Sequence, residues 1–213
     1  MALCVDDFTY ECDYKGERET WVYEGNGKYR YVLGKCGNNP LICFGINPSD
    51  ACIAGVKEKG NVPQVKPDST MYRVRNISKL LGFDGYIMLN ICPYINKNPS
   101  VLKGLGEEYS DENNELNLRY IEKVFEKYRD NNILWACWGK SIVNGNYLIQ
   151  SLERVNEVVK RYNKTWKTIK WTNVEPRHPH HPLRISNDEV LKAKKDFPNV
   201  DMVRYISRLK GEK

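Results

Sequence analysis

Three histidines close together are the residues of this chain best suited to chemistry. His178, His180 and His181 are the only histidines among 213 residues, and Arg177 and Arg184 lie beside them in the sequence. A neutral imidazole can donate a hydrogen bond to a reacting oxygen, and it can also bind a transition metal. Neighbouring histidines rarely converge on one ion without a carboxylate. The cluster therefore favours a hydrogen-bonding role, and no metal ligand is assigned.

Polar or turn-forming segments follow four apolar runs that have the pattern of buried strands. The runs span residues 41–46, 86–91, 133–138 and 166–171, and they lead into segments 45–51, 90–94, 138–141 and 175–182. In a parallel sheet, ligands bind in the crevice outside the carboxyl ends of the strands. We therefore expect the four strand exits to line one site.

Helical patterns alternate with these strands. An apolar stripe begins after Asp68, a capping residue type, and ends at Gly82, and similar stripes span residues 112–128 and 147–162. Near the N-terminus, Gly-Asn-Gly at residues 25–27 predicts a β-hairpin. The alternation predicts an α/β fold of three layers, α/β/α, with a mostly parallel central sheet of about four strands and the hairpin added.

The chain is expected to form a single α/β domain over residues 1–213. Residues 1–40 would be the hairpin region, 41–186 the core, and 187–213 a basic helical tail. No apolar run is long enough to cross a bilayer, and the first residues do not resemble a signal peptide. The seven cysteines have no C-x-x-C spacing, which is typical of reduced core residues. We predict a cytoplasmic protein with no membrane partner.

The positive charge is concentrated in the last third of the chain. The formal net charge is +6, and residues 151–213 carry 15 Lys and Arg against 8 Asp and Glu. Residues 1–150 carry 18 Lys and Arg against 19 Asp and Glu. This asymmetry suits a polyanion such as nucleic acid, and it equally suits a solvated basic helix without a partner.

Several motifs, in order along the chain, resemble an uncharacterised domain-of-unknown-function family. The hallmark of that family is an Asn-Pro-Ser-x-Ala turn after its first core strand, here Asn47 to Ala51. The resemblance covers nearly all of residues 29–184, and its remaining motifs are Tyr29-Arg30-Tyr31-Val32-Leu33, Asp68-x-Thr70-x-x-Arg73, Leu89-Asn90, Trp138-Gly139 and Pro176-Arg177-His178-Pro179.

The chain also resembles the uracil-DNA glycosylase superfamily. The shared features are a Gly-x-x-Pro turn after the first core strand, an Asn at a strand end, a Trp-Gly strand end and a His-Pro loop. They correspond here to Gly45–Pro48, Leu89-Asn90, Trp138-Gly139 and His178-Pro179. The resemblance implies a glycosylase-like fold and an activity on the bond between a base and its sugar.

The same resemblance implies roles for the first two strand exits. Asn47 would orient a water toward the anomeric carbon, within a turn shaped by Gly45 and Pro48. Asn90 would recognise a base edge with its amide. The mismatch-specific branch has Asn where other branches have a catalytic Asp, and Asp50 is close enough in sequence to substitute. The structural alternative is that Asn47 only stabilises the turn through hydrogen bonds to its own backbone, and that Asn90 only fixes the loop that follows its strand.

A histidine would supply the hydrogen bond to the leaving base. The family pattern has Leu directly after Pro-Arg-His-Pro, whereas this chain inserts three residues before Leu183. Either His178 or His181 could therefore occupy the functional position. Arg177, beside them, is assigned to substrate binding.

The start of the helix after Asp68 is a second candidate contact with the substrate. Asp68, Thr70 and Arg73 are assigned to substrate binding, as a phosphate contact at a helix N-terminus, and Ser49 joins them from the first turn. The structural alternative is a capping Asp68 followed by a solvent-facing Arg73.

Together these observations lead to one hypothesis and two alternatives. The hypothesis is an enzyme that hydrolyses an N-glycosidic bond of a nucleic-acid base or nucleotide with a positioned water and a histidine donor, and without a cofactor. The first alternative is a non-catalytic module that binds nucleic acid or a nucleotide. The second is a metal-dependent hydrolase that uses the histidines with Asp50 or Asp68. The expected partner is nucleic acid or a nucleotide.

Overall fold

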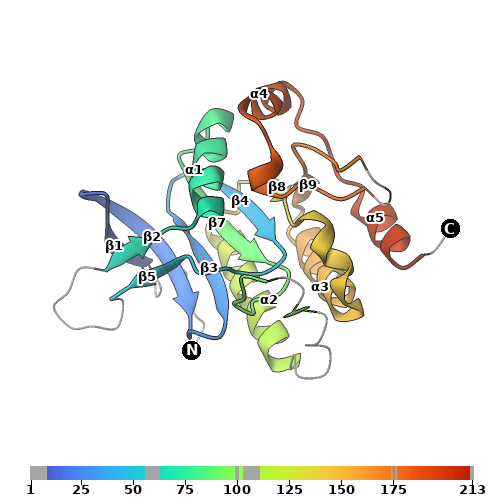
Figure 1. Ribbon diagram of the computed structural model, residues 1–213, viewed down its shortest axis with the longest axis horizontal. Coiled ribbons are helices and arrows are strands. Elements are labelled where there is room, and N and C mark those ends of the chain that lie inside the picture. Colours follow the sequence, from blue (N-terminus) through green and yellow to red (C-terminus); the bar gives the residue numbers. More distant parts are fainter. Residues whose placement is uncertain are drawn as a thin grey trace.

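The computed structural model describes residues 9–55, 63–98, 101–102, 111–173, 175 and 177–211. Within them one mixed sheet of nine strands has the order β5-β6-β1-β2-β3-β7-β4-β8-β9 (Figure 1). Its strands are β1 Thr9–Tyr14, β2 Glu17–Gly25, β3 Arg30–Lys35, β4 Pro40–Gly45, β5 Cys52–Ala54, β6 Gln64–Lys66, β7 Gly85–Asn90, β8 Ile133–Ala136 and β9 Thr165–Lys167.

The sheet mixes antiparallel and parallel pairs, four of each among the described strands. β1 with β2, β2 with β3, β3 with β7 and β5 with β6 are antiparallel pairs. β7, β4, β8 and β9 are parallel to one another. The prediction of a mostly parallel sheet of about four strands, like that of the uracil-DNA glycosylases, is therefore wrong.

The prediction failed because the N-terminal residues extend the same sheet: the expected hairpin at residues 25–27 is present and joins β2 to β3, but its strands continue the sheet instead of standing apart from it. β3 pairs with β7, and this joins the N-terminal strands to the parallel ones. β1 alternates polar with apolar residues, a strand signal that the prediction did not use, whereas β5 and β6 are only three residues long each. Such short strands carry too little periodicity to be recognised.

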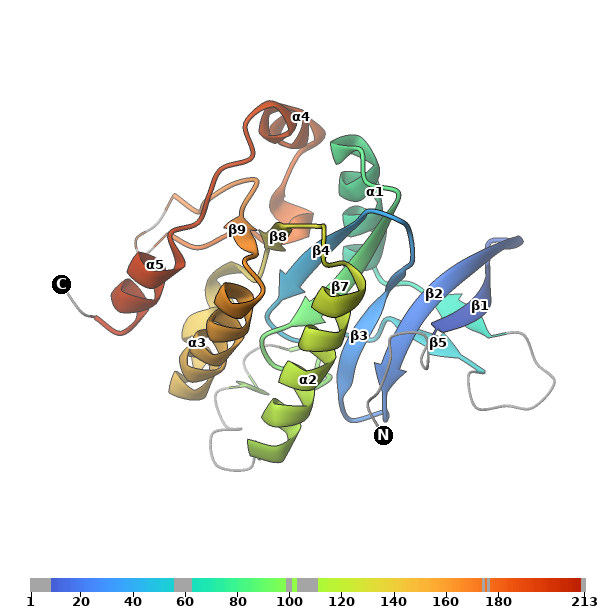
Figure 2. The same ribbon diagram turned by 180° about the vertical axis from the view of Figure 1, so that it is seen from behind.

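Helices cover both faces of the sheet (Figures 1 and 2). Buried residues alternate along β4: Leu41 and Cys43 pack on one side, and Ile42 and Phe44 on the other. The first side holds α1 Ser69–Leu81 and α4 Asn187–Lys195, and the second holds α2 Asp111–Lys127, α3 Asn146–Arg161 and α5 Met202–Leu209. The short helices are η3 Gly139–Asn144 and η4 Pro182–Arg184.

Helix α1 has the ends that its sequence predicts. Asp68 is its N-cap and accepts the backbone N–H of Met71 at 2.8 Å, and Gly82 ends it with φ of 95°. Arg75 joins the helix to the sheet through two hydrogen bonds to the buried Glu19 carboxylate, at 2.9 and 2.6 Å. The helix is therefore fixed to strand β2 of the sheet.

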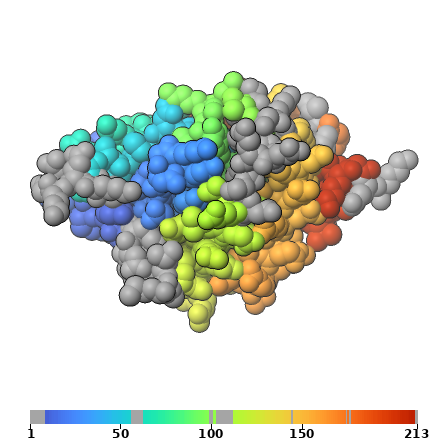
Figure 3. Space-filling view, turned by 90° about the horizontal axis from the view of Figure 1, so that it is seen from below, coloured from blue at the N-terminus to red at the C-terminus, as the bar shows by residue number. Residues whose placement is uncertain are grey.

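The basic tail packs on the domain. Val190 and Ala193 of α4 are buried on the α1 side, and Met202, Tyr205 and Ile206 of α5 are buried on the α3 side. In Figure 3 the N-terminal strands lie at one end of the molecule and α5 at the other. In the described part of the chain, no helix combines the length and apolar character that a membrane span requires.

The contact between β3 and β7 is predicted to depend on Gly34. A Cβ at this position would lie 2.1 Å from the carbonyl oxygen of Tyr86 and 2.8 Å from the Cα of Ile87. Gly34→Ala should therefore force the two strands apart and lower the free energy of unfolding by about 3 kcal/mol, measured by urea denaturation. Gly16→Ala is the control, because it has φ of +81° but no atom within 4 Å of its added Cβ. Its cost should be about 1 kcal/mol, and equal losses in the two variants would contradict the prediction.

Candidate functional site

A cleft of about 640 Å³ lies at the carboxyl ends of β4, β7 and β8. Parallel pairing brings the ends of these strands to the same edge of the sheet. The start of α1 and the loop that follows β9 complete the walls. Seven of the twelve predicted site residues line the cleft: Gly45, Asn47, Ser49, Asp68, Thr70, Asn90 and His181.

Asn90 is the last residue of β7 and pairs in register with Gly45 at the end of β4. Its side chain is 1% exposed, and its Nδ2 has no hydrogen-bond partner among the described residues. Its Oδ1 would lie 2.9 Å from a Cβ on Gly45, so the glycine makes room for the amide. A buried donor without an acceptor costs about 1–3 kcal/mol, which a ligand acceptor can recover.

Asn47 holds the neighbouring loop in place. Its Nδ2 donates to the carbonyl oxygens of Pro48, Tyr94 and Asn96 at 3.0, 3.3 and 2.8 Å. The buried Pro48 does not line the cleft, and its carbonyl also accepts the backbone N–H of Asn96 at 2.9 Å. Only the Oδ1 of Asn47 is left to act on a ligand or a water, and it can only accept.

The carboxylates near this turn are engaged. Ser49 Oγ donates a hydrogen bond to Asp68, whose other oxygen caps α1. The exposed Asp50 forms an ion pair with Lys97 and does not line the cleft. Neither carboxylate is therefore positioned as a general base. Thr70, in the first turn of α1, lines the cleft as predicted.

Arg30 is a cleft residue that sequence reasoning did not assign. Its side chain is 5% exposed, Nη1 donates to the carbonyl of Ala51, and Nε has no partner in the described residues. Burial lowers its pKa to about 10, and the charge of Asp68 acts in the opposite direction. The guanidinium therefore stays charged at pH 7. No ion pair joins it to a carboxylate in the described chain, so it is available to an anion.

His181 is the histidine with the geometry of a donor. It lines the cleft beside Gly139, and its Nδ1 accepts the backbone N–H of Leu183 at 3.4 Å. Burial lowers the pKa of His181, with Arg184 acting in the same direction and Asp68 against it. The ring is therefore neutral at pH 7, and Nε2 carries its proton.

His178 serves the packing of the tail. It is buried outside the cleft, with Nδ1 2.9 Å from the hydroxyl oxygen of Tyr205. That hydroxyl also accepts the Nε1–H of Trp138 at 3.0 Å. His180 lines the cleft, and burial lowers its pKa, with Lys170 acting in the same direction.

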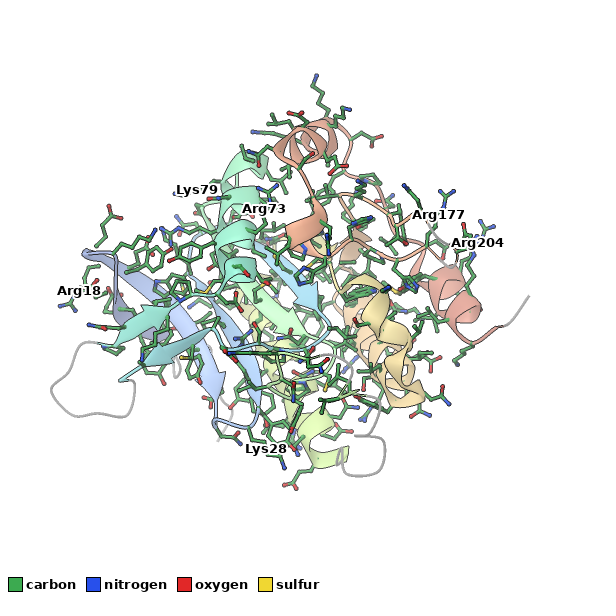
Figure 4. All side chains as sticks on the ribbon, in the orientation of Figure 1. Arg18, Lys28, Arg73, Lys79, Arg177 and Arg204 are labelled. Carbon is green, nitrogen blue, oxygen red and sulfur yellow. The ribbon has the colours of Figure 1, made fainter. Side chains whose placement is uncertain are left out.

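Two predicted arginines do not line the cleft: Arg73 lies on α1 and Arg177 lies near α5 (Figure 4). Arg73 donates to Asn187 Oδ1 at 2.7 Å and to the carbonyl of Ile185 at 2.6 Å, and so fastens the end of η4 and the start of α4 to α1. Arg177 is exposed and forms an ion pair with Glu175 at 3.0 Å. Neither is placed to contact a ligand in the cleft.

The cleft is positively charged. Its lining includes the cations Arg30, Lys97, Lys140 and Arg184 and the single carboxylate of Asp68. Lys97 is paired with Asp50, but Lys140 and Arg184 make no ion pair with any described residue. An anionic ligand is therefore favoured.

The histidines and carboxylates do not gather into a metal centre. No group of three or more His, Cys, Asp or Glu side chains with metal-binding geometry occurs in residues 9–55, 63–98, 101–102, 111–173, 175 and 177–211. His178 and His181 are turned to different partners, and Asp68 is held by Ser49 and the helix cap.

A family described as protein of unknown function (DUF1643) has a sequence model that matches residues 30–183. The chain belongs to this family. The resemblance to a domain-of-unknown-function family is thus confirmed, whereas the likeness to uracil-DNA glycosylases stays a prediction. A search of curated proteins gives no match. The DUF1643 match begins at Arg30 and includes Asn47, Asn90 and His181.

The sequence of this DUF1643 protein does contain signals for some of the cleft residues that were not predicted. Arg30 is a charged residue at the start of a buried strand, which is rare without a partner or a ligand. Lys140 and Ser141 directly follow the Trp138-Gly139 strand exit. Thr172 had no comparable signal, because it reaches the cleft through the irregular loop after β9.

Asn47→Ala should destabilise the protein as well as change the cleft. Three backbone carbonyls would lose the Nδ2 donor, so the free energy of unfolding should fall by about 2 kcal/mol in urea denaturation. Asn38→Ala, at an exposed loop position, is the control and should change stability by less than about 0.5 kcal/mol. Equal stability of the two variants would show that Asn47 does not hold the loop.

Proposed function

We propose that the cleft binds a nucleotide unit and hydrolyses the N-glycosidic bond between its base and its sugar. The observation that carries the proposal is the buried Nδ2 of Asn90, which lines the cleft without an acceptor in the described residues. A base edge offers carbonyl and ring-nitrogen acceptors that would satisfy it. The cost of the orphaned donor is then offset when the ligand binds.

The cations of the cleft favour a ligand that carries an anionic group. Arg30 lies in the wall with an unpaired Nε, and Lys140 and Arg184 bring two further charges. A base alone is neutral, so these cations favour a base that is joined to a phosphate. Charge-assisted hydrogen bonds from Arg are well suited to phosphate oxygens.

The neutral His181 would support the departure of the base. The oxygen of a water would attack the anomeric carbon, the C–N bond would break, and its electron pair would pass to the base. A base carbonyl that becomes anionic would accept a hydrogen bond from Nε2–H of His181, and a donor of this kind contributes about 3 kcal/mol. Asn47 Oδ1 would orient the water. The products are a sugar with a hydroxyl at the anomeric carbon and a free base, which takes up the proton that the water loses.

A second candidate function is binding without hydrolysis. The observation that favours it is the engagement of both nearby carboxylates: Asp68 by Ser49 and the cap of α1, and Asp50 by Lys97. Neither is placed to activate a water. In this case the same donors would recognise a nucleotide, and no bond would break.

The proposed activity would operate in the cytoplasm, in DNA repair or nucleotide turnover. The described cysteines, Cys12, Cys36, Cys43, Cys52, Cys92 and Cys137, are free thiols, as expected of a reducing compartment.

Release of a free base is the direct test of the glycosylase proposal. Oligonucleotides that contain uracil, hypoxanthine or a mismatched pair, and nucleoside monophosphates of uracil and hypoxanthine, would be incubated with the protein and a chelator. Free base would be measured by mass spectrometry. Asn90→Ala should lower kcat/KM at least 100-fold, about the effect of losing one preorganised donor. The variant should still fold, because this Nδ2 makes no hydrogen bond with a described residue.

Asn76→Ala is the matched control, because it removes an exposed amide from α1 and should keep full activity. If the folded protein releases no base from any substrate but still binds nucleotides, the hydrolysis proposal falls and the binding function stands. Undiminished activity of Asn90→Ala would show that the cleft is not the site.

A further inference from the structure

A second pocket, of about 270 Å³, shares no lining residue with the cleft. It lies between α5 and the loop after β9, and its lining includes Trp171, Arg177, Arg204 and Arg208. Arg204 and Arg208 are four residues apart and lie on one face of α5. Figure 4 shows Arg177 and Arg204 close together at one side of the molecule. Arg204 and Arg208 lie beyond the residues that the DUF1643 model matches.

This pocket has more arginines than carboxylates that pair with them in the described chain. Arg204 and Arg208 make no ion pair with a residue of the described chain, and Arg177 has one exposed partner, Glu175. Asp201 also lines the pocket, but its Oδ1 accepts the backbone N–H of Arg204 and caps α5.

Packing does not account for these charges. The buried residues of α5 are Met202, Tyr205 and Ile206, whereas Arg204 and Arg208 are exposed. Two cations four residues apart on a helix repel each other and slightly destabilise it. Their placement around a concavity is therefore better explained by an anionic ligand than by stability.

The second pocket and the cleft share a wall. Trp171 lines the pocket, and the next residue, Thr172, lines the cleft. The backbone N–H of Thr172 donates to the carbonyl of His178 at 2.8 Å, and the backbone N–H of His178 donates to Thr172 Oγ1 at 2.8 Å. Tyr205 lines the pocket and accepts the Nε1–H of the cleft residue Trp138. A ligand in one pocket would thus lie close to a ligand in the other.

We propose that the second pocket binds a backbone phosphate of a single nucleic-acid strand whose neighbouring nucleotide occupies the cleft. Arg204, Arg208 and Arg177 contact the phosphate, and the half-buried Trp171 offers a ring on which the adjacent base stacks. Arginines beside an aromatic side chain are the combination that holds single strands without sequence preference. The inference rests on the proposed occupant of the cleft, and it makes the substrate a polynucleotide instead of a free nucleotide.

Binding of a fluorescein-labelled single-stranded oligonucleotide tests this site. Fluorescence anisotropy at increasing salt would compare the wild type with Arg204→Gln/Arg208→Gln. The variant should bind about tenfold more weakly at low salt. The slope of log K against log[salt] should be shallower by about 1.4, which corresponds to two lost contacts with single-stranded phosphates. Its affinity for a nucleoside 5′-monophosphate, measured by calorimetry, should equal that of the wild type.

Arg18→Gln/Lys79→Gln is the matched control, because it removes the same charge from exposed positions far from the pocket (Figure 4). Equal oligonucleotide binding by the two double variants would overturn the proposal. A second result would also overturn it: the wild type binds inorganic phosphate or the monophosphate as tightly as the oligonucleotide, and Arg204→Gln/Arg208→Gln loses that binding. The pocket would then be a site for free phosphate.

The base-release assay separates the two proposals. Oligonucleotide binding that depends on Arg204 and Arg208 supports the second pocket even if no base is released. Base release from monophosphates, without binding of the oligonucleotide, keeps the proposed function and overturns the second pocket.

Discussion

The parallel register between β4 and β7 is the constraint on which the rest of the site depends. It sets Gly45 beside Asn90 at the edge of the sheet, and the missing side chain of the glycine leaves space for the amide. The strand end thereby acquires a buried hydrogen-bond donor that the described part of the protein does not satisfy. Asn117 Nδ2 donates to the backbone carbonyl of Asn90 at 3.0 Å and holds that strand end from the α2 side.

The same edge carries charge that the fold does not neutralise. Arg30 is buried at the start of β3 with its Nε unpaired in the described structure. Asp68, the negative charge that acts on it most strongly, already accepts hydrogen bonds from Ser49 and from the start of α1. Buried charges without a paired partner cost stability, and proteins keep them where a ligand supplies the partner. Asn90 and Arg30 together therefore fit a ligand that has a neutral edge with hydrogen-bond acceptors and an anionic group. A nucleotide has both, in its base and its phosphate.

The sequence predicted which strand ends would meet, but it did not predict the sheet that holds them. Apolar runs located β4, β7 and β8, whereas β5 and β6 are too short for any period to appear. Both His178 and His181 were candidates for the donor, and only the path of the loop after β9 separates the cleft histidine from the one beside Tyr205. Arg73 had the pattern of a phosphate contact, yet it binds the segment before α4, which is 112 residues distant in the sequence. Such long-range partners leave no local signal.

The most direct test of the central claim is a crystal structure of the protein with a bound nucleoside 5′-monophosphate. We expect the base in the cleft, with one of its acceptor atoms about 3 Å from Asn90 Nδ2, and the phosphate on the side of Arg30, Lys140 and Arg184. A nucleotide bound elsewhere, or a base in the cleft that leaves Asn90 Nδ2 without an acceptor, would contradict the account.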